Sequence, residues 1–303
     1  SGRAPIFDQG HFEESDEEEA RPNPLTRIFV PFRLPGPMRD WQNPVLVREL
    51  RWESLGGGAW ILNFAALALA ASAASAVWHI LARAQPALWA LVAIGAAAIA
   101  ALALSAPAMA REFDQRTFES MAATPLRPFS ILWGKAWIAI RTSFILLALE
   151  TVPAAAAMAF SDRGMFDALP ALGLVAAATI ILLSVVGLFC SFLARSASQA
   201  LVNAFAAAAL PFVGGPAFCR LLWMYSDLEP SRYSWLALLS PATPLLAMAG
   251  SPWLKEGALG HPLAPERYIG IFCALSAGLA LALFIVMAAG FDYFWKKGPL
   301  KKL

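Results

Sequence analysis

Charged and metal-binding residues are scarce in this sequence. Only 15% of its 303 residues are charged, whereas 59% are apolar. A soluble domain has about a quarter of its residues charged, so this much apolar surface cannot be buried in one water-exposed core. The three cysteines and three histidines are scattered, without the short spacing of a metal site or a disulfide framework. These scarcities exclude a soluble enzyme, a fibrous protein and a disulfide-stapled secreted protein.

Motifs for nucleotide binding and catalysis are also absent from the sequence. It has no Gly-x4-Gly-Lys-Ser/Thr loop, no Gly-x-Ser-x-Gly elbow and no His-Glu-x-x-His pair. Gly56, Gly57 and Gly58 are not followed by Lys-Ser/Thr, so we interpret them as a hinge and not as a phosphate loop. We therefore expect that this chain is not an enzyme, and that it binds no cofactor, metal or nucleic acid itself.

What the sequence has instead is a series of apolar runs of bilayer-spanning length. About 20 residues are needed to cross roughly 30 Å of hydrocarbon, and an open chain can cross only as α-helices because the bilayer offers no water to its peptide groups. The expected fold class is an all-α integral membrane protein with six transmembrane helices. The six predicted spans cover residues 59–82, 87–110, 137–160, 169–194, 200–223 and 268–291.

Prolines and glycines interrupt the chain near the fifth predicted span. This span itself is broken by Pro211, Gly214, Gly215 and Pro216. Residues 234–250, which follow it, are apolar but contain two further prolines, so they are short for a membrane crossing. We interpret 234–250 as re-entrant half-helices between spans five and six. A seventh crossing is the rival interpretation, and it would invert the C-terminus.

The distribution of positive charge predicts the topology. Basic residues collect on the side reached after an even number of crossings; they are Arg39, Arg48, Arg51, Arg111, Arg116, Arg127, Lys135, Arg195, Lys296, Lys297, Lys301 and Lys302. Both termini are then cytoplasmic, which an even number of crossings requires. The alanine-rich composition favours a multi-pass protein of the bacterial cytoplasmic (inner) membrane.

Three regions follow from this organisation. Residues 1–40 are acidic and proline-rich and form a disordered cytoplasmic arm, for which a docking peptide is the alternative interpretation. Residues 41–295 form the six-helix membrane domain, and 296–303 a basic cytoplasmic tail. At the start of the domain, an N-terminal interfacial helix is predicted. Asn43 can cap it, Pro44 suits its first position, and its charged residues suit lipid headgroups; these are Arg48, Glu49 and Arg51.

The segment between spans two and three carries a resemblance to a known family. Residues 111–135 read REFDQRTFESMAATPLRPFSILWGK, residues 43–51 read NPVLVRELR and residues 239–241 read LSP. In this order and spacing they resemble the ABC-2 type transporter permeases, whose cytoplasmic loop contains a sequence motif such as GTxExLLxTPL followed by ILxGK. Gln115 and Arg116 stand where the family has a glycine before the threonine. The resemblance covers about residues 41–295.

The resemblance implies the membrane-spanning subunit of an ABC exporter. ATP and Mg²⁺ would bind to a separate ATP-binding subunit, and the loop after span two would be a cytoplasmic coupling helix contacting that subunit. The implied contact residues are Arg111, Glu112, Arg116, Thr117, Glu119, Thr124 and Pro125. Two copies, or two related chains, would form a homodimer or heterodimer among membrane lipids. The alternatives are a mere connecting loop and a non-transporting scaffold or assembly factor; the fold alone cannot select a substrate.

Glu150 lies near the middle of the third predicted span, where an unpaired carboxylate is costly. Arg141 is nine residues away, too far for an intrahelical pair. A substrate-path or proton-linked role is one interpretation, and a structural acid hydrogen-bonded to Ser184 or Asn203 is the other.

The pairing of the cysteines is also open. Cys219 and Cys273 fall near one membrane face and could form a disulfide, or serve as small buried apolar residues.

Overall fold

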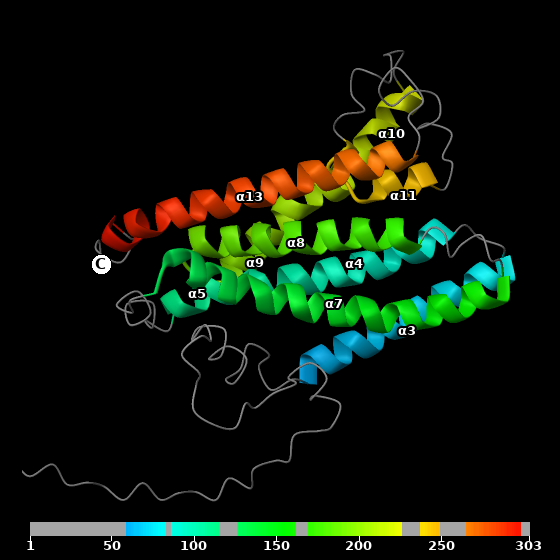
Figure 1. The fold of residues 1–303 in the computed structure, drawn as a ribbon, viewed down its shortest axis with the longest axis horizontal. Helices are drawn as coiled ribbons and strands as arrows, with labels where there is room; N and C mark the ends of the chain where they lie inside the picture. The colour runs from blue at the N-terminus through cyan, green and yellow to red at the C-terminus, as the bar shows by residue number, and fades with distance from the viewer. Residues whose placement is uncertain are drawn as a thin grey trace, which may run out of the picture.

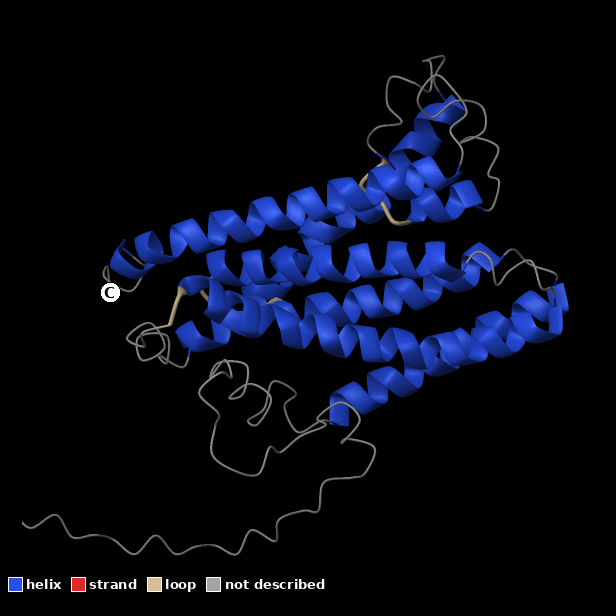
Figure 2. Ribbon diagram, viewed as in Figure 1, coloured by secondary structure: helices blue, strands red, loops and turns tan. Residues whose placement is uncertain are grey.

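A computed structural model describes residues 59–82, 86–114, 126–161, 169–225, 237–248 and 265–297. The predicted acidic arm and the interfacial helix with Asn43, Pro44, Arg48, Glu49 and Arg51 lie outside these residues. Within them the chain is helical and contains no strand (Figure 2). The all-α prediction is therefore confirmed for the described part of the chain.

The helices follow one another in short succession. Their bounds are α3 (Ala59–Ala82), α4 (Pro86–Ser105), α5 (Pro107–Asp114), α7 (Pro128–Ser161), α8 (Leu169–Leu193), α9 (Ala197–Ala209), the π-helical segment η2 (Leu210–Gly214), α10 (Gly215–Tyr225), α11 (Ala242–Met248) and α13 (Pro265–Lys297). The predicted fourth span at 169–194 agrees with α8 to within one residue. The first two residues of the predicted basic tail, Lys296 and Lys297, belong to α13.

Five helical stretches are long and apolar enough to cross a membrane. They are Ala90–Asp114, Pro128–Pro153, Leu169–Leu193, Ala197–Leu222 and Glu266–Phe291, and α3 contributes a shorter apolar stretch, Asn63–Trp78. A chain with five such stretches is a multi-pass membrane protein, because lipid is the solvent that such surfaces match.

The long helices lie side by side and run alternately in opposite directions (Figure 1). At the centre, α4 packs against both α7 and α8; α3 covers α7 and α4 on one side, and α13 covers α8 on the other. At one end of the bundle lie α5, the start of α7, the α8–α9 connection and the C-terminal end of α13 (Figure 1). We call this the α5 end. The opposite end, with α10, α11 and the start of α13, is the α11 end.

The main apolar core joins the central helices to α5, α9 and α13. Its fully buried members include Met109 of α5, Leu132 of α7, Leu188 of α8, Ala204 of α9 and Met287 of α13. Alanines fill much of the space between the helices, and such small side chains let helix backbones approach closely in a membrane. This core lies toward the α5 end and holds the candidate site described below.

Predicted spans two, three and five differ from the observed helices. Span three was predicted at 137–160, whereas α7 begins at Pro128 and its membrane-spanning stretch is Pro128–Pro153. Span two was predicted to run through residues 87–110, but α4 ends at Ser105 and the chain restarts as α5 at Pro107. The break at Ala106 was not predicted, because the hydropathy continues through the proline, but the membrane-spanning stretch Ala90–Asp114 still runs through α4 and α5. Span five was predicted to be broken, yet α9, η2 and α10 follow without a gap. A π-helical segment absorbs Pro211 at its start, which is the way single π turns accommodate an irregularity inside a helix.

The segment after α10 contains one described helix, the seven-residue α11. Seven residues rise only about 10 Å in an α-helix, so α11 is too short to cross a membrane. Ser240, just before it, donates a hydrogen bond from its hydroxyl to the Phe212 carbonyl oxygen of η2 at 2.7 Å. This bond attaches the predicted re-entrant region to the irregular part of the fifth span. The disulfide between Cys219 and Cys273 is not formed, because both cysteines are free.

Candidate functional site

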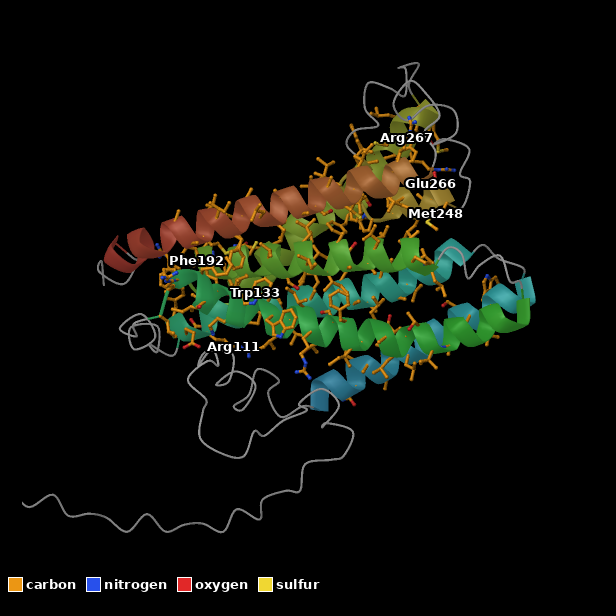
Figure 3. The ribbon with its side chains drawn as sticks, viewed as in Figure 1. Arg111, Trp133, Phe192, Met248, Glu266 and Arg267 are labelled. Carbon is orange, nitrogen blue, oxygen red and sulfur yellow. The ribbon has the colours of Figure 1, made fainter. Side chains whose placement is uncertain are left out.

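The candidate site is the α5 end, where two of the predicted contact residues are described. Figure 3 labels Arg111 at this end together with Trp133 and Phe192, and Met248, Glu266 and Arg267 at the α11 end. Arg111 is exposed, whereas Glu112 is buried. The other predicted contact residues, which are Arg116, Thr117, Glu119, Thr124 and Pro125, belong to segment 115–125 and lie outside the described residues.

The corner between α4 and α5 is held by a serine of α8. A helix that starts at a proline loses nothing at its first position, but its next backbone N–H groups still need acceptors. The N–H groups of Met109 and Ala110 both donate to Ser191 Oγ, at 2.8 and 2.9 Å. All three residues are buried, so one hydroxyl satisfies two donors that water cannot reach. Ser191 therefore positions α5 on α8.

A glycine lets α4 and α8 meet at this corner. A Cβ atom at Gly187 would overlap the Ser105 hydroxyl and would lie 3.1 Å from the Ala106 nitrogen. The Ser105 hydroxyl in turn donates to the Ala101 carbonyl at 2.7 Å. Because the end of α4 fills the space that a side chain at residue 187 would need, only glycine allows this approach.

A buried ion pair connects α5 to α7. Lys135 Nζ lies 2.9 Å from Glu112 Oε1, and the two side chains are 2% and 6% exposed. Removing one member of such a pair strands the other charge away from water, which costs much more than an exposed ion pair contributes. Glu112 was predicted to contact a partner subunit. In the structure its carboxylate instead points inward. It joins α5, which ends just before segment 115–125, to α7, which begins just after it.

Asp114, the last residue of α5, attaches the same segment to α9. Its Oδ2 atom accepts a hydrogen bond from the Ala197 N–H at 3.1 Å. Ala197 is the first residue of α9, and Ser196 is its N-cap, whose hydroxyl accepts a hydrogen bond from the Gln199 N–H at 3.3 Å. A carboxylate at a helix N-terminus satisfies an orphan donor and complements the helix dipole. The end of α5 thus caps a helix 83 residues later in the chain.

Aromatic side chains surround the start of α7. The rings of Phe129 and Phe284 are 5.1 Å apart, those of Trp133 and Phe284 6.3 Å, and those of Trp133 and Trp137 5.8 Å. These contacts join the first turns of α7 to α13. Phe129 and the two tryptophans are exposed, as expected for an aromatic belt where a bundle leaves the hydrocarbon.

Glu150 lies away from this site, inside the bundle. It is completely buried, and neither of its carboxylate oxygens has a hydrogen-bond partner in the described part of the chain. The predicted bonds to Ser184 and Asn203 are not present: the Ser184 hydroxyl is itself unpartnered among the described residues, and Asn203 is exposed. The structural interpretation of Glu150 therefore fails in the form in which it was predicted.

Together the contacts at the α5 end fix both ends of segment 115–125. One end is held by Ser191 and Asp114 to α8 and α9, and the Glu112–Lys135 pair joins it to α7. Helix α5, which ends just before segment 115–125, is therefore attached to α7, α8 and α9. Among the described residues no group of His, Cys, Asp and Glu is arranged to hold a metal.

Sequence reasoning missed three residues of this site. Asp114 lies inside the segment that carries the family resemblance, so its position was a usable signal. Ser191 and Gly187 gave only the signal of small residues in an apolar helix, which is common throughout this chain. Their roles depend on what faces them across the helix packing.

The fold and the site define a class: an α-helical multi-pass membrane protein with a braced corner at one end of its bundle. No family model matches the chain, and no curated protein matches it.

Proposed function

We propose that this chain is the membrane-spanning permease subunit of an ATP-driven, ABC-2 type exporter. In this proposal α3 is the first span and completes a set of six with the five stretches above. The α5 end faces the cytoplasm of a bacterium, with both termini on that side. Segment 115–125 is the coupling helix. ATP and Mg²⁺ bind to a separate ATP-binding subunit, and two permease chains, identical or related, enclose the path of a substrate that the sequence does not specify.

Three observations support the proposal. Five apolar stretches make the chain a multi-pass membrane protein. The sequence of residues 111–135 resembles that of the permease family's coupling loop. Described basic residues gather at the α5 end, where Arg111, Arg127 and Lys135 lie, as cytoplasmic ends of membrane proteins require.

The observation that carries the proposal is the bracing of segment 115–125 at its ends. A loop that only connects two helices needs no buried ion pair beside it, because an exposed connection can move freely at little cost. Here Glu112 and Lys135 form such a pair, and Asp114 caps α9. This arrangement suits a segment that receives a push from a partner protein and transmits it into the bundle.

Crosslinking tests the partner. A photoreactive residue replaces Arg111 or Arg127, both exposed at the α5 end, and in the matched control it replaces Glu266, exposed at the α11 end. We expect crosslinks to an ATP-binding protein from the first two positions and not from the third, identified by mass spectrometry of the purified adducts. Equal capture from all three positions, or none from the α5 end, would contradict the proposal.

ATP hydrolysis by the captured complex separates a permease from a scaffold. The Asp114→Ala substitution frees α9 from α5 without touching segment 115–125, so we expect the complex to form normally and its ATPase rate to fall several-fold. Arg267→Ala, at the α11 end, is the control and leaves the rate unchanged. A complex whose ATPase rate ignores Asp114→Ala supports the alternative, a scaffold or assembly factor built on the same fold.

A further inference from the structure

A glutamate without a partner lies inside the bundle, where the proposed coupling mechanism does not use it. Glu150 is 0% exposed, and it is among the largest fully buried side chains of the chain. Its two carboxylate oxygens have no hydrogen-bond partner among the described residues. This setting differs from that of Glu112, whose carboxylate faces a lysine.

Among the described side chains, the helices around Glu150 bring no charge to it; His79, near the end of α3, lies outside that set. Helix α7 packs against α3, α4 and α8. Residues 63–78 of α3 and 90–105 of α4 contain no titratable side chain, and α8 contains only Cys190, close to its end at Leu193. On α7 itself Arg141 is nine residues away, which is about 13 Å along the axis.

The described side chains of α13 do not supply a countercharge either. Its ring contacts with α7 are those of Phe284 with Phe129 and Trp133, in the first turns of α7. The charged residues near its start, Glu266 and Arg267, are exposed at the α11 end. An ionised Glu150 would therefore stand unpaired in an apolar interior, whereas the neutral acid avoids burying a charge.

The contact between α3 and α7 lies beside the backbone of Glu150. Buried Ala65, Ala68, Ser72 and Ala76 are all small, and the Ser72 hydroxyl donates to the main-chain oxygen of Glu150 at 2.8 Å. Small residues allow close packing without interlocking side chains, and in a bilayer lipid can replace the contacts that separate.

We propose that Glu150 is a proton-binding site within the subunit, which holds its proton while α3 packs on α7 and exchanges it with water when α3 separates. Loading transfers a proton from hydronium to the carboxylate, which forms one O–H bond and leaves a water molecule. Unloading transfers the proton back to water and leaves a hydrated carboxylate. The site takes a proton and no larger ligand, because the described structure leaves the side chain no exposed surface. This inference does not depend on the proposed exporter function.

Infrared spectroscopy of the full chain in phosphatidylcholine–phosphatidylglycerol nanodiscs tests the loaded state. At neutral pH a buried, protonated carboxyl gives a C=O stretching band that ionised carboxylates lack. We expect the wild type to show one such band, Glu150→Gln to abolish it, Glu150→Asp to shift it, and the matched control Glu266→Gln to leave it unchanged. A wild type without the band, or a band that persists in Glu150→Gln, would overturn the proposal.

Hydrogen–deuterium exchange of the same band tests whether the proton exchanges when α3 separates. Ser72→Leu places a bulky side chain between α3 and α7, so we expect the band to shift in D₂O at least several-fold faster than in the wild type. Ser75→Leu is the matched control, because the Ser75 hydroxyl bonds only within α3, to the Ser72 carbonyl at 2.8 Å. Equal exchange in the two variants would refute the opening at α3. Circular dichroism and gel filtration verify folding, and the Glu150→Asp shift keeps the test decisive if Glu150→Gln does not fold.

Discussion

Two helices of this protein, α8 and α13, are equally apolar over their most hydrophobic stretch but have opposite surroundings. In α8 56% of that stretch is buried inside the chain, and in α13 only 28%. The same contrast separates α4 and α7, each 61% buried, from the α9–η2–α10 stretch, which is 11% buried. The molecule therefore has a packed centre, made by α4, α7 and α8, and an open side, made by α9, η2, α10 and α13.

This contrast shows that the hydropathy of a helix indicates whether it can lie in lipid, but not which other helices it contacts. Lipid tails are as apolar as leucine, so an exposed apolar face costs nothing in a bilayer and gives no drive for helices to associate. Helices pack where small residues permit close contact and polar groups bond across. The centre has both, in Gly187 and in Ser191 with its two backbone donors. The open side instead shows large side chains such as Leu210 and Val213.

Removing the charge of Lys135 gives the largest expected difference between the two regions. Lys135→Met leaves Glu112 without its cation inside the packed centre, so we expect the free energy of unfolding to fall by about 3–5 kcal/mol. The measurement is steric trapping in bicelles. Arg267→Met, at the exposed start of α13, is the control and changes it by less than about 0.5 kcal/mol.

A double variant sharpens the same prediction. Glu112→Leu combined with Lys135→Met removes both charges, so most of the loss is recovered, because an apolar pair can replace a buried ion pair. If the double variant were as unstable as Lys135→Met, the loss would come from packing and not from the stranded carboxylate.

Adding one methyl group distinguishes the regions next. In Gly187→Ala the new Cβ overlaps Ser105, and such overpacking costs about 1–3 kcal/mol. In Gly278→Ala, on α13, the Cβ meets nothing within 4 Å. There we expect a gain of up to about 1 kcal/mol, because alanine favours the helix over glycine. Thermal unfolding of both variants in the same nanodiscs shows opposite shifts; shifts of the same sign would break the comparison.

Truncating a leucine gives the smallest expected effect. Leu132 is fully buried in the centre, whereas Leu210 is 76% exposed on the open side. In a bilayer Leu132→Ala loses packing but little transfer energy, so we expect about 1–2 kcal/mol, below the range of water-soluble cores. Leu210→Ala changes the stability of the single chain by less than about 0.5 kcal/mol. Denaturation by sodium dodecyl sulfate measures both, and an equal loss in the two variants would mean that the open side is packed after all.

Some of the fold could be predicted from the sequence with good boundaries. The apolar run of α8 was placed to within one residue, because loops rich in polar or small turn residues flank it on both sides. The break after α4 was missed, since Ala106 and Pro107 continue an apolar run. The π-helical turn at Pro211 was missed for a related reason: proline signals an interruption, but neighbouring contacts decide whether the helix stops or bulges.

The candidate site shows the same division. The motif in residues 111–135 predicted where along the chain the site lies. Arg111 is exposed, as a contact residue must be. The inward turn of Glu112 toward Lys135 could not be foreseen, because both charges stand in a segment where exposed charges are the ordinary expectation.

The sequence by itself determined that this protein is a helical membrane protein. The length and apolarity of a segment decide whether it can enter lipid, and in lipid its peptide groups must bond to one another within a helix. Only the tertiary structure decided which apolar faces meet protein, which serine serves two distant donors, and which of two buried glutamates has a cation beside it. Those outcomes depend on groups brought together from distant parts of the chain, such as Met109 and Ser191. Local composition carries no record of such pairings.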